Sequence, residues 1–551
     1  MSRAEPPQVS FADLEFIQQG IVLDPVLQTI SNFLDQHEGM IKKVRSDLER
    51  GLKNPATGRN GLTPSQVLRS LVLMRVKSWD LRELSERIAD GYTLRSFTDF
   101  RSQTVPKHDA FHRAFNRLTP QTLHAVNELL VQAAIDRGLE DGNQLRVDST
   151  VVETDIHHPT DNTLLWDTVR VITRLVAHLG EAVGQAVKGF RNHSRAARRR
   201  MQQIQRMTTK QRHEQQTRKY RELIGITQAV VSGARGVLQR TRKAKGQGLV
   251  ADLTLGQLRK EIEHYCELGE QVVDQARRRV LEGEQVPTAQ KIYSIFEPHT
   301  DLIKRGKVQT PIEFGHKIFL AESAQGLITQ YKVLDGNPCD EDQVAASLAH
   351  HRERFGHAPQ LYGSDRGFYS ENNVKMCEQE GVKVISIPQR GGKKTPQREA
   401  YEKSSAFKKG QRFRAGIEGR ISVLFRGRGM KRCLAEGREH FELLVGAGGA
   451  PFRFDFAGSR PVPSVFPQPA GDQADSLAHQ VRQPNGQVTV IGFMTAFIAR
   501  ATATGDITIT ILNVAGCGPS PSAGRAVSGG CFAYSGSPYL MITGRSASPA
   551  C

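Results

Sequence analysis

A short apolar run that contains one carboxylate, Leu145 to Val152, constrains the fold of this chain more than any other stretch. Its apolar positions are mostly β-branched and a polar cluster, His157 to Asp161, follows, so the pattern predicts a buried β-strand that ends there. Asp148 lies inside this run, and an acid on a core strand is costly unless it is paired or binds a metal. On its own, an Asp followed by Ser and Thr is more often a cap at a strand end than a catalytic group. The choice between a cap and a catalytic group therefore depends on other parts of the chain.

Residues 60–140 carry the signals of a compact helical domain of the DNA-binding type. Thr63, Pro64 and Gln66 predict a capped helix start, and apolar residues recur behind such starts at helical spacing. Two short helices joined near Trp79 fit a helix-turn-helix, and an ordinary helical bundle fits the pattern at least as well. We expect residues 1–59 to form a partly helical extension before this domain.

A long helical insertion is predicted for residues 162–285, directly after the first strand. Its first helix has apolar residues at helical spacing and should pack against a partner. In the following part basic residues crowd a helix with few apolar positions, among them Arg195, Arg198, Arg199 and Arg200. Such a helix is either exposed to solvent on all sides, or its positive charge is neutralised by a partner such as a phosphate backbone. Acidic partners one helical turn away are scarce, which favours DNA.

From Lys291 onwards the hydrophobic pattern changes to a period of two. A β-hairpin is predicted from residues 313–320 and 327–334, joined near Gly326. Helices near 341–354 and 371–379 then alternate with short strands near 360–363 and 382–387, before a helical pattern at 413–424. This order implies an α/β fold with a mixed sheet covered by helices. We therefore assign residues 141–161 and 286–446 to one core that the insertion interrupts.

The last part of the chain, residues 447–551, differs in character. It is rich in Gly, Ser, Pro and Ala, with short apolar runs such as 488–491 and 507–511. This composition is typical of an appended or disordered tail, and a change of reading frame in the gene would produce the same abrupt shift.

The formal net charge of +18 over 551 residues indicates a polyanionic partner. Nucleic acid is the first candidate, because clustered Lys and Arg gain affinity by releasing counterions from phosphates. A basic enzyme with a solvated charged face is the alternative. No apolar run is long enough to span a bilayer, and residues 1–19 lack the apolar region of a signal peptide. The seven cysteines are dispersed without a CxxC pair, which fits a reducing cytoplasm.

Three acids stand at comparable places in the predicted core. Asp148 is in the first strand, Asp365 follows a later strand, and Glu418 is on the helix near its end. Strand ends and an adjacent helix can bring such acids within reach of one metal ion, and their hard oxygen ligands suit Mg²⁺ or Mn²⁺. Two such ions can activate an attacking oxygen and stabilise the leaving one in a phosphoryl transfer. The spacing alone is weak evidence, since a chain of this size contains many acids.

The residues around these acids form five sequence words: Asp148-Ser-Thr-Val-Val-Glu-Thr154, Pro159-Thr-Asp-Asn-Thr-Leu-Leu-Trp-Asp-Thr-Val-Arg170, Glu313-Phe-Gly-His-Lys317, Asp365-Arg-Gly-Phe-Tyr369 and Arg414-Ala-Gly-Ile-Glu-Gly-Arg420. Together they resemble the bacterial insertion-sequence DDE transposases, most closely the ISNCY-type group, over about residues 60–445. The resemblance implies an RNase H-like catalytic core with an N-terminal helical domain. It also implies metal-dependent cleavage and joining of DNA at element ends by a multimeric complex.

Matched residue by residue, the resemblance makes Asp148, Asp365 and Glu418 the catalytic, metal-binding triad. Arg414 matches a basic residue that contacts DNA phosphate, and we expect Arg420 to join it as a DNA contact. Two positions depart from the family pattern: Gln411 stands where an aromatic residue is common, and Phe425 where a Lys is common. The usual apolar closing helix is not recognisable after Gly448.

The sequence therefore predicts a DNA transposase that uses Mg²⁺ or Mn²⁺ for strand cleavage and strand transfer at insertion-sequence ends. The expected partners are double-stranded DNA with terminal inverted repeats and further copies of the chain, in the bacterial cytoplasm at the nucleoid and without a membrane. The alternatives are a catalytically inactive, transposase-derived DNA-binding protein and a metal-dependent nuclease that does not join strands. His157 and His158 are expected at a turn or on the surface, and His316 in packing or hydrogen bonding.

Overall fold

The computed structural model describes residues 2–3, 11–18, 20–54, 57, 59–183, 189–207, 213–244, 248–304, 311–449, 479–482 and 488–491. The chain divides into two units, Met1–Phe456 and Ala457–Cys551. In the second unit the described residues are two short antiparallel strands, β10 (His479–Arg482) and β11 (Val488–Ile491). The apolar run at 488–491 is thus a strand. The predictions for the rest of the tail after Gly449 fall outside the described residues.

Helices dominate the first 136 residues. They are α1 (Phe11–Gln18), α2 (Pro25–Gln36), α3 (Glu38–Glu49), α4 (Pro64–Lys77), α5 (Leu81–Asp90), α6 (Tyr92–Phe97), α7 (His108–Phe115) and α8 (Pro120–Asp136). The predicted start of α4 is confirmed, because Thr63 and Gln66 form a reciprocal capping box. Ser78 then turns the chain in a left-handed conformation, and Asp80 caps α5. One hydrophobic core joins α2 and α3 to the helices after residue 60.

A mixed open sheet follows, and it confirms the predicted combination of parallel and antiparallel strands. Its central strand is β3 (Gln144–Thr154), which pairs antiparallel with β5 (Ile312–Ser323) and parallel with β7 (Leu361–Gly363). The sheet continues through β4 (Asp301–Lys304) on one side and β8 (Val384–Ser386) on the other, while β6 (Ile328–Val333) pairs with β5 and β9 (Arg432–Cys433) with β3. The predicted hairpin is β5–β6, with Gly326 in the left-handed conformation its turn requires.

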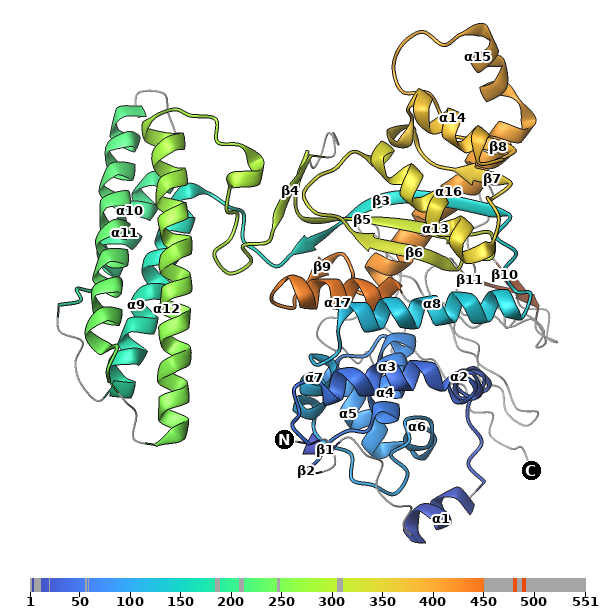
Figure 1. Ribbon diagram of the computed structural model, residues 1–551, viewed down its shortest axis with the longest axis horizontal. Coiled ribbons are helices and arrows are strands. Elements are labelled where there is room, and N and C mark those ends of the chain that lie inside the picture. Colours follow the sequence, from blue (N-terminus) through green and yellow to red (C-terminus); the bar gives the residue numbers. More distant parts are fainter. Residues whose placement is uncertain are drawn as a thin grey trace, which may run out of the picture. The chain divides into compact units, whose positions relative to one another are not determined.

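Helices cover both faces of this sheet (Figure 1). On one face, Val147 and Phe319 share a core with residues of α13 (Gln343–Phe355) and α14 (Glu371–Gln379). On the other, Val152 and Leu320 pack against α16 (Ser405–Gly427) and α17 (Arg438–Gly449), while α15 (Pro396–Lys403) precedes α16. Side chains alternate between the faces of a strand, and Asp148 pairs with Leu320. Asp148 therefore faces α16.

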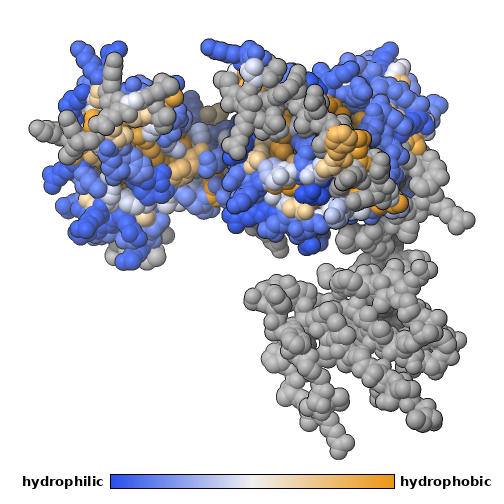
Figure 2. Space-filling model, turned by 90° about the horizontal axis from the view of Figure 1, so that it is seen from below, coloured by the Kyte–Doolittle hydropathy of each residue, from blue (hydrophilic) through white to orange (hydrophobic). Residues whose placement is uncertain are grey.

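In the described parts of the insertion between β3 and β4, four α-helices are present. They are α9 (Asp161–Val183), α10 (Ser194–Gln205), α11 (His213–Thr241) and α12 (Leu249–Ala276), and their apolar faces meet in one hydrophobic core. The predicted helical insertion after the first core strand is present. No helix among the described residues is long and apolar enough to cross a membrane. On the face drawn in Figure 2, hydrophilic residues cover most of the described surface.

Candidate functional site: three acids around one arginine

The three acids predicted to act together do meet at one end of the sheet. The parallel pair β3–β7 places Arg146 beside Gly363, and Asp148 and Asp365 each lie two residues further along. Helix α16 can approach this end because Gly410 has no side chain: a Cβ there would lie 2.5 Å from the Ser386 Cβ of β8. The approach brings Arg414 and Glu418, one helical turn apart, over the two aspartates.

The guanidinium of Arg414 contacts all three carboxylates. One of its terminal nitrogens donates to Asp148 Oδ2 at 2.9 Å and lies 3.9 Å from Asp365 Oδ2, and the other donates to Glu418 Oε1 at 2.8 Å. We call these four residues the acid cluster. Its side chains range from nearly buried to open, with exposed fractions of 12% for Asp148, 38% for Asp365 and 67% for Glu418. The cluster is thus accessible to a ligand from the Glu418 side.

Backbone N–H groups orient the two aspartates. Asp148 Oδ1 accepts a hydrogen bond from the Ser149 N–H at 2.8 Å, and Asp365 Oδ1 accepts one from the Gly367 N–H at 2.8 Å. The Asp365 bond also caps the 3₁₀ helix η5 (Arg366–Phe368). In both residues the second oxygen, Oδ2, is the one that faces Arg414. The aspartates are held by the chain before any ligand binds.

The donor set of the acid cluster fits a divalent cation. Three carboxylates and one guanidinium carry a net charge of about −2 when all are ionised, and hard oxygen donors are those that Mg²⁺ and Mn²⁺ prefer. As the side chains stand, no three His, Cys, Asp or Glu residues of the described parts are arranged to hold a metal ion together. Arg414 lies among the carboxylates instead, so a bound ion would require the guanidinium to move away from at least one of them.

Gln411, where the family pattern has an aromatic residue, has a structural role. Its side-chain amide donates to the Ser386 carbonyl at 2.6 Å and to the Ser364 carbonyl at 3.2 Å. It therefore ties α16 to the ends of β7 and β8, immediately beside Asp365. The second departure, Phe425, is partly buried and packs against the core between the sheet and α16.

Arg420, predicted to contact DNA together with Arg414, lies in a separate ion cluster. Its Nε donates to Glu322 Oε1 at 2.7 Å, and Arg146 Nε donates to Glu322 Oε2 at 2.8 Å. The Glu322 side chain is 1% exposed and both arginines are 13% exposed. We call these three residues the Glu322 cluster. Arg420 thus supports the attachment of α16 to β5, while its contact with DNA stays a prediction.

The basic residues predicted on the insertion fall into two groups. Arg195, Arg198 and Arg199 are exposed on α10, whose Ala197 and Ile204 are buried in the insertion core. Among the described residues no ion pair is found for these three arginines. Arg200 is partly buried and forms an ion pair with Glu222 of α11. Three of the four side chains are therefore available to a phosphate backbone.

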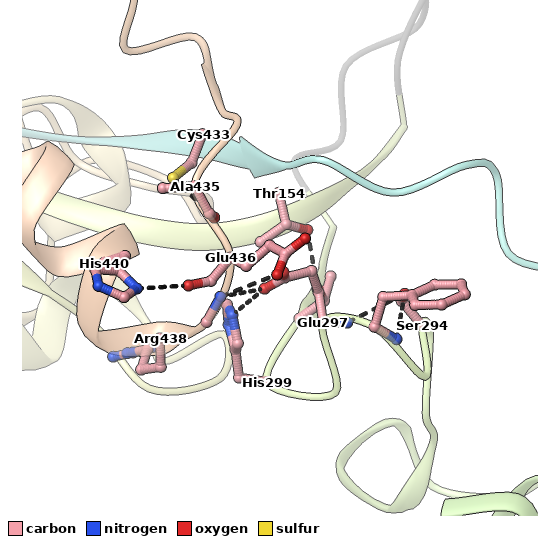
Figure 3. Close-up of polar contacts among 12 residues, drawn as sticks. Thr154, Ser294, Glu297, His299, Cys433, Ala435, Glu436, Arg438 and His440 are labelled. Carbon is pink, nitrogen blue, oxygen red and sulfur yellow. Dashed lines mark hydrogen bonds and ion pairs between the residues drawn. The ribbon is translucent and has the colours of Figure 1, made fainter. Parts of the chain in front are cut away.

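A second polar cluster lies where the chain returns from the insertion to the sheet (Figure 3), and the sequence reading missed most of it. Glu297 Oε2 lies 2.6 Å from His299 Nε2. On its other side, His299 Nδ1 lies 2.7 Å from His316 Nε2. His316 Nδ1 lies 2.8 Å from Asp301 Oδ2, which confirms its predicted hydrogen-bonding role. Burial and the neighbouring His316 lower the pKa of His299. The alternation of Glu297, His299 and Asp301 was the available signal.

His157 follows the strand as expected but has a definite partner. Its Nε2 lies 2.7 Å from Asp167 Oδ2 of α9, and this hydrogen bond raises the pKa of His157. The residue links the turn after β3 to the first helix of the insertion.

Comparisons of the chain with known protein families, with curated proteins and with solved structures found no match.

Proposed function

We propose that the protein is a DNA transposase with an RNase H-like core, which cleaves and joins DNA strands at insertion-sequence ends. The observation that carries the proposal is the meeting of Asp148, Asp365 and Glu418 around Arg414, from three elements far apart in the sequence. The sequence words around these acids point to the same three residues independently of this geometry. The mixed sheet, with β3 between an antiparallel and a parallel neighbour, also supports this core.

A purely structural ion cluster is the competing explanation. Such a cluster should balance its charges and exclude water, since a buried charge without a partner is costly. The acid cluster differs on both counts: its four residues by themselves carry two negative charges in excess, and Glu418 is mostly exposed. Accessible carboxylates in excess are expected at a site that binds a positively charged ligand such as a metal ion.

In the proposed reaction, Asp148, Asp365 and Glu418 would hold Mg²⁺ or Mn²⁺. The ions would neutralise phosphate charge and favour ionisation of the attacking hydroxyl. The chain itself supplies positioning: the Ser149 and Gly367 N–H groups fix the two aspartates. Arg414, once displaced from the acids, would donate to a phosphate oxygen of the bound strand. The exposed arginines of α10 would contact the DNA backbone without reading its sequence.

The partners that follow from this proposal are double-stranded DNA with terminal inverted repeats and additional copies of the chain. A bacterial transposase of this kind would act in the cytoplasm, at the nucleoid.

The proposal is tested with Asp148→Asn and a duplex carrying the element end. We expect this variant to lose Mg²⁺-dependent strand cleavage while its affinity for the duplex stays nearly unchanged, because the substitution removes a ligand charge and little volume. Asp155→Asn is the matched control, since Asp155 is an exposed aspartate just after the same strand. Retained cleavage in Asp148→Asn overturns the assignment. Binding without cleavage by the unmodified chain favours the catalytically inactive alternative.

A further inference from the structure

A cavity of about 510 Å³ adjoins the acid cluster, and its wall includes Asp365. Ser149 and Thr150 of β3 form part of the wall. Its charged lining residues are the cations Lys304, Lys317, Arg366 and Arg390 and the acids Asp340 and Asp365. Four positive and two negative charges give a net charge of about +2, opposite in sign to the adjoining acid cluster. The cavity is therefore suited to an anionic group whose neighbouring atoms reach the acids.

Lys317 is the most enclosed of these cations. It lies on β5 with only 9% of the residue exposed, and its Nζ donates to the Pro338 carbonyl at 2.8 Å. The same nitrogen lies 2.8 Å from Asp340 Oδ1. The contact with Asp340 is an ion pair without a hydrogen bond among the described residues. Of the three N–H donors of the ammonium group, the Pro338 carbonyl therefore takes one, and two are left for a ligand in the cavity.

Asp340 can lie close to the acid cluster because Gly367 has no side chain. A Cβ at Gly367 would lie 3.1 Å from Asp340 Oδ2 and 3.0 Å from Asp365 Oδ1. The turn that carries Asp365 therefore packs directly against the carboxylate that pairs with Lys317. An anion bound to Lys317 in place of Asp340 would lie beside Asp365.

We propose that this cavity binds a phosphate group of a nucleotide unit, with Lys317 as its main contact and Asp340 as an internal anion that occupies Lys317 when no nucleic acid is bound. This inference rests on the proposed function, because it assigns the bound phosphate to the strand next to the bond that is cut. The volume is within the usual range of small-ligand sites, roughly 300–1,000 Å³. Lys317 is thus a residue that binds the phosphate directly, and Asp340 makes binding dependent on displacing an ion pair.

The test measures binding of a short fluorescein-labelled single-stranded oligonucleotide to the full chain, in buffer with chelator and without divalent ions. Lys317→Met should weaken binding by roughly tenfold, as expected for loss of one hydrogen bond to a charged group. Lys317→Arg should retain most of the affinity. Asp340→Asn should strengthen binding several-fold, because the lysine no longer has an internal partner. Lys332→Met and Glu353→Gln, both at exposed positions, are the matched controls for the two charge changes.

Because Lys317→Met should weaken oligonucleotide binding and Asp340→Asn should strengthen it, the two variants together distinguish a binding role from a structural one. If Lys317→Met and Asp340→Asn both lower the free energy of unfolding and change affinity no more than their controls, the inference is wrong. Competition with thymidine monophosphate distinguishes the sources of the phosphate: displacement at micromolar concentration would identify a free-nucleotide site and overturn the DNA assignment. Cleavage of the element end by the unmodified chain is measured separately. Failure of cleavage counts against the proposed function, whereas unchanged binding in the variants counts against the cavity alone.

Discussion

Two ion clusters join the same helix to the same sheet, and they differ in charge balance and in exposure to water. These two properties distinguish a structural site from a reactive one. The Glu322 cluster places one carboxylate between two arginines, and water is almost excluded from it. The acid cluster places one arginine among three carboxylates and leaves the outermost acid open. Helix α16 contributes Arg420 to the first and Arg414 to the second, six residues apart. The role of an arginine on this helix therefore does not follow from its residue type. It follows from the charge balance of its cluster and from the exposure of its partners.

The largest effect on stability is expected from Glu322→Gln. This change leaves Arg146 and Arg420 as two nearly buried cations without their carboxylate, and breaking such a buried pair typically costs about 3–5 kcal/mol. Urea denaturation followed by circular dichroism measures the free energy of unfolding. Glu418→Gln is the matched control in the acid cluster, and because Glu418 is 67% exposed its change should stay below about 1 kcal/mol. Equal losses in the two variants would remove the distinction between the clusters.

A smaller effect, on ligand affinity, is expected from Arg414→Gln. The substitution removes a cation that contacts all three carboxylates, and at about 4 Å an opposite charge contributes several kcal/mol near a protein surface before screening. We expect roughly tenfold tighter binding of Mn²⁺ by isothermal titration, with DNA absent. Arg412→Gln, an exposed arginine two residues earlier on α16, should leave the affinity unchanged. Weaker Mn²⁺ binding in Arg414→Gln would show that the arginine organises the carboxylates for metal and does not compete with it.

Sequence patterns predicted the parts of this molecule that depend on local periodicity. The hairpin β5–β6, the insertion after β3 and the capping box before α4 all follow from neighbouring residues. The three acids were selected from sequence words, and only the fold shows them sharing Arg414. That contact depends on α16 lying close to the ends of β7 and β8, which in turn depends on Gly410, where a Cβ would lie 2.5 Å from the Ser386 Cβ.

The residues that sequence reasoning missed have partners far along the chain. Glu322 sits in an ordinary strand pattern, and its arginines lie 176 residues before it and 98 residues after it. His299 and His316 are closer in sequence, but they meet only because β4 pairs antiparallel with β5 and places Asp301 opposite Gly315. No local spacing encodes such pairs. The same limit applies to Lys317 and Asp340, which belong to separate elements.

The smallest expected effect is on the salt dependence of DNA binding, and it compares exposed with paired arginines on the insertion. Replacing Arg195, Arg198 and Arg199 with Ala should reduce the slope of log binding constant against log salt concentration by roughly 2–3, since each neutralised phosphate contributes about 0.9. Fluorescence anisotropy with labelled duplex between 50 and 200 mM salt, a range in which such contacts are roughly measurable, gives the slope. Arg200→Ala should change it little, because Arg200 already pairs with Glu222. An unchanged slope in the triple variant would mean that this face of α10 points to solvent in the DNA complex.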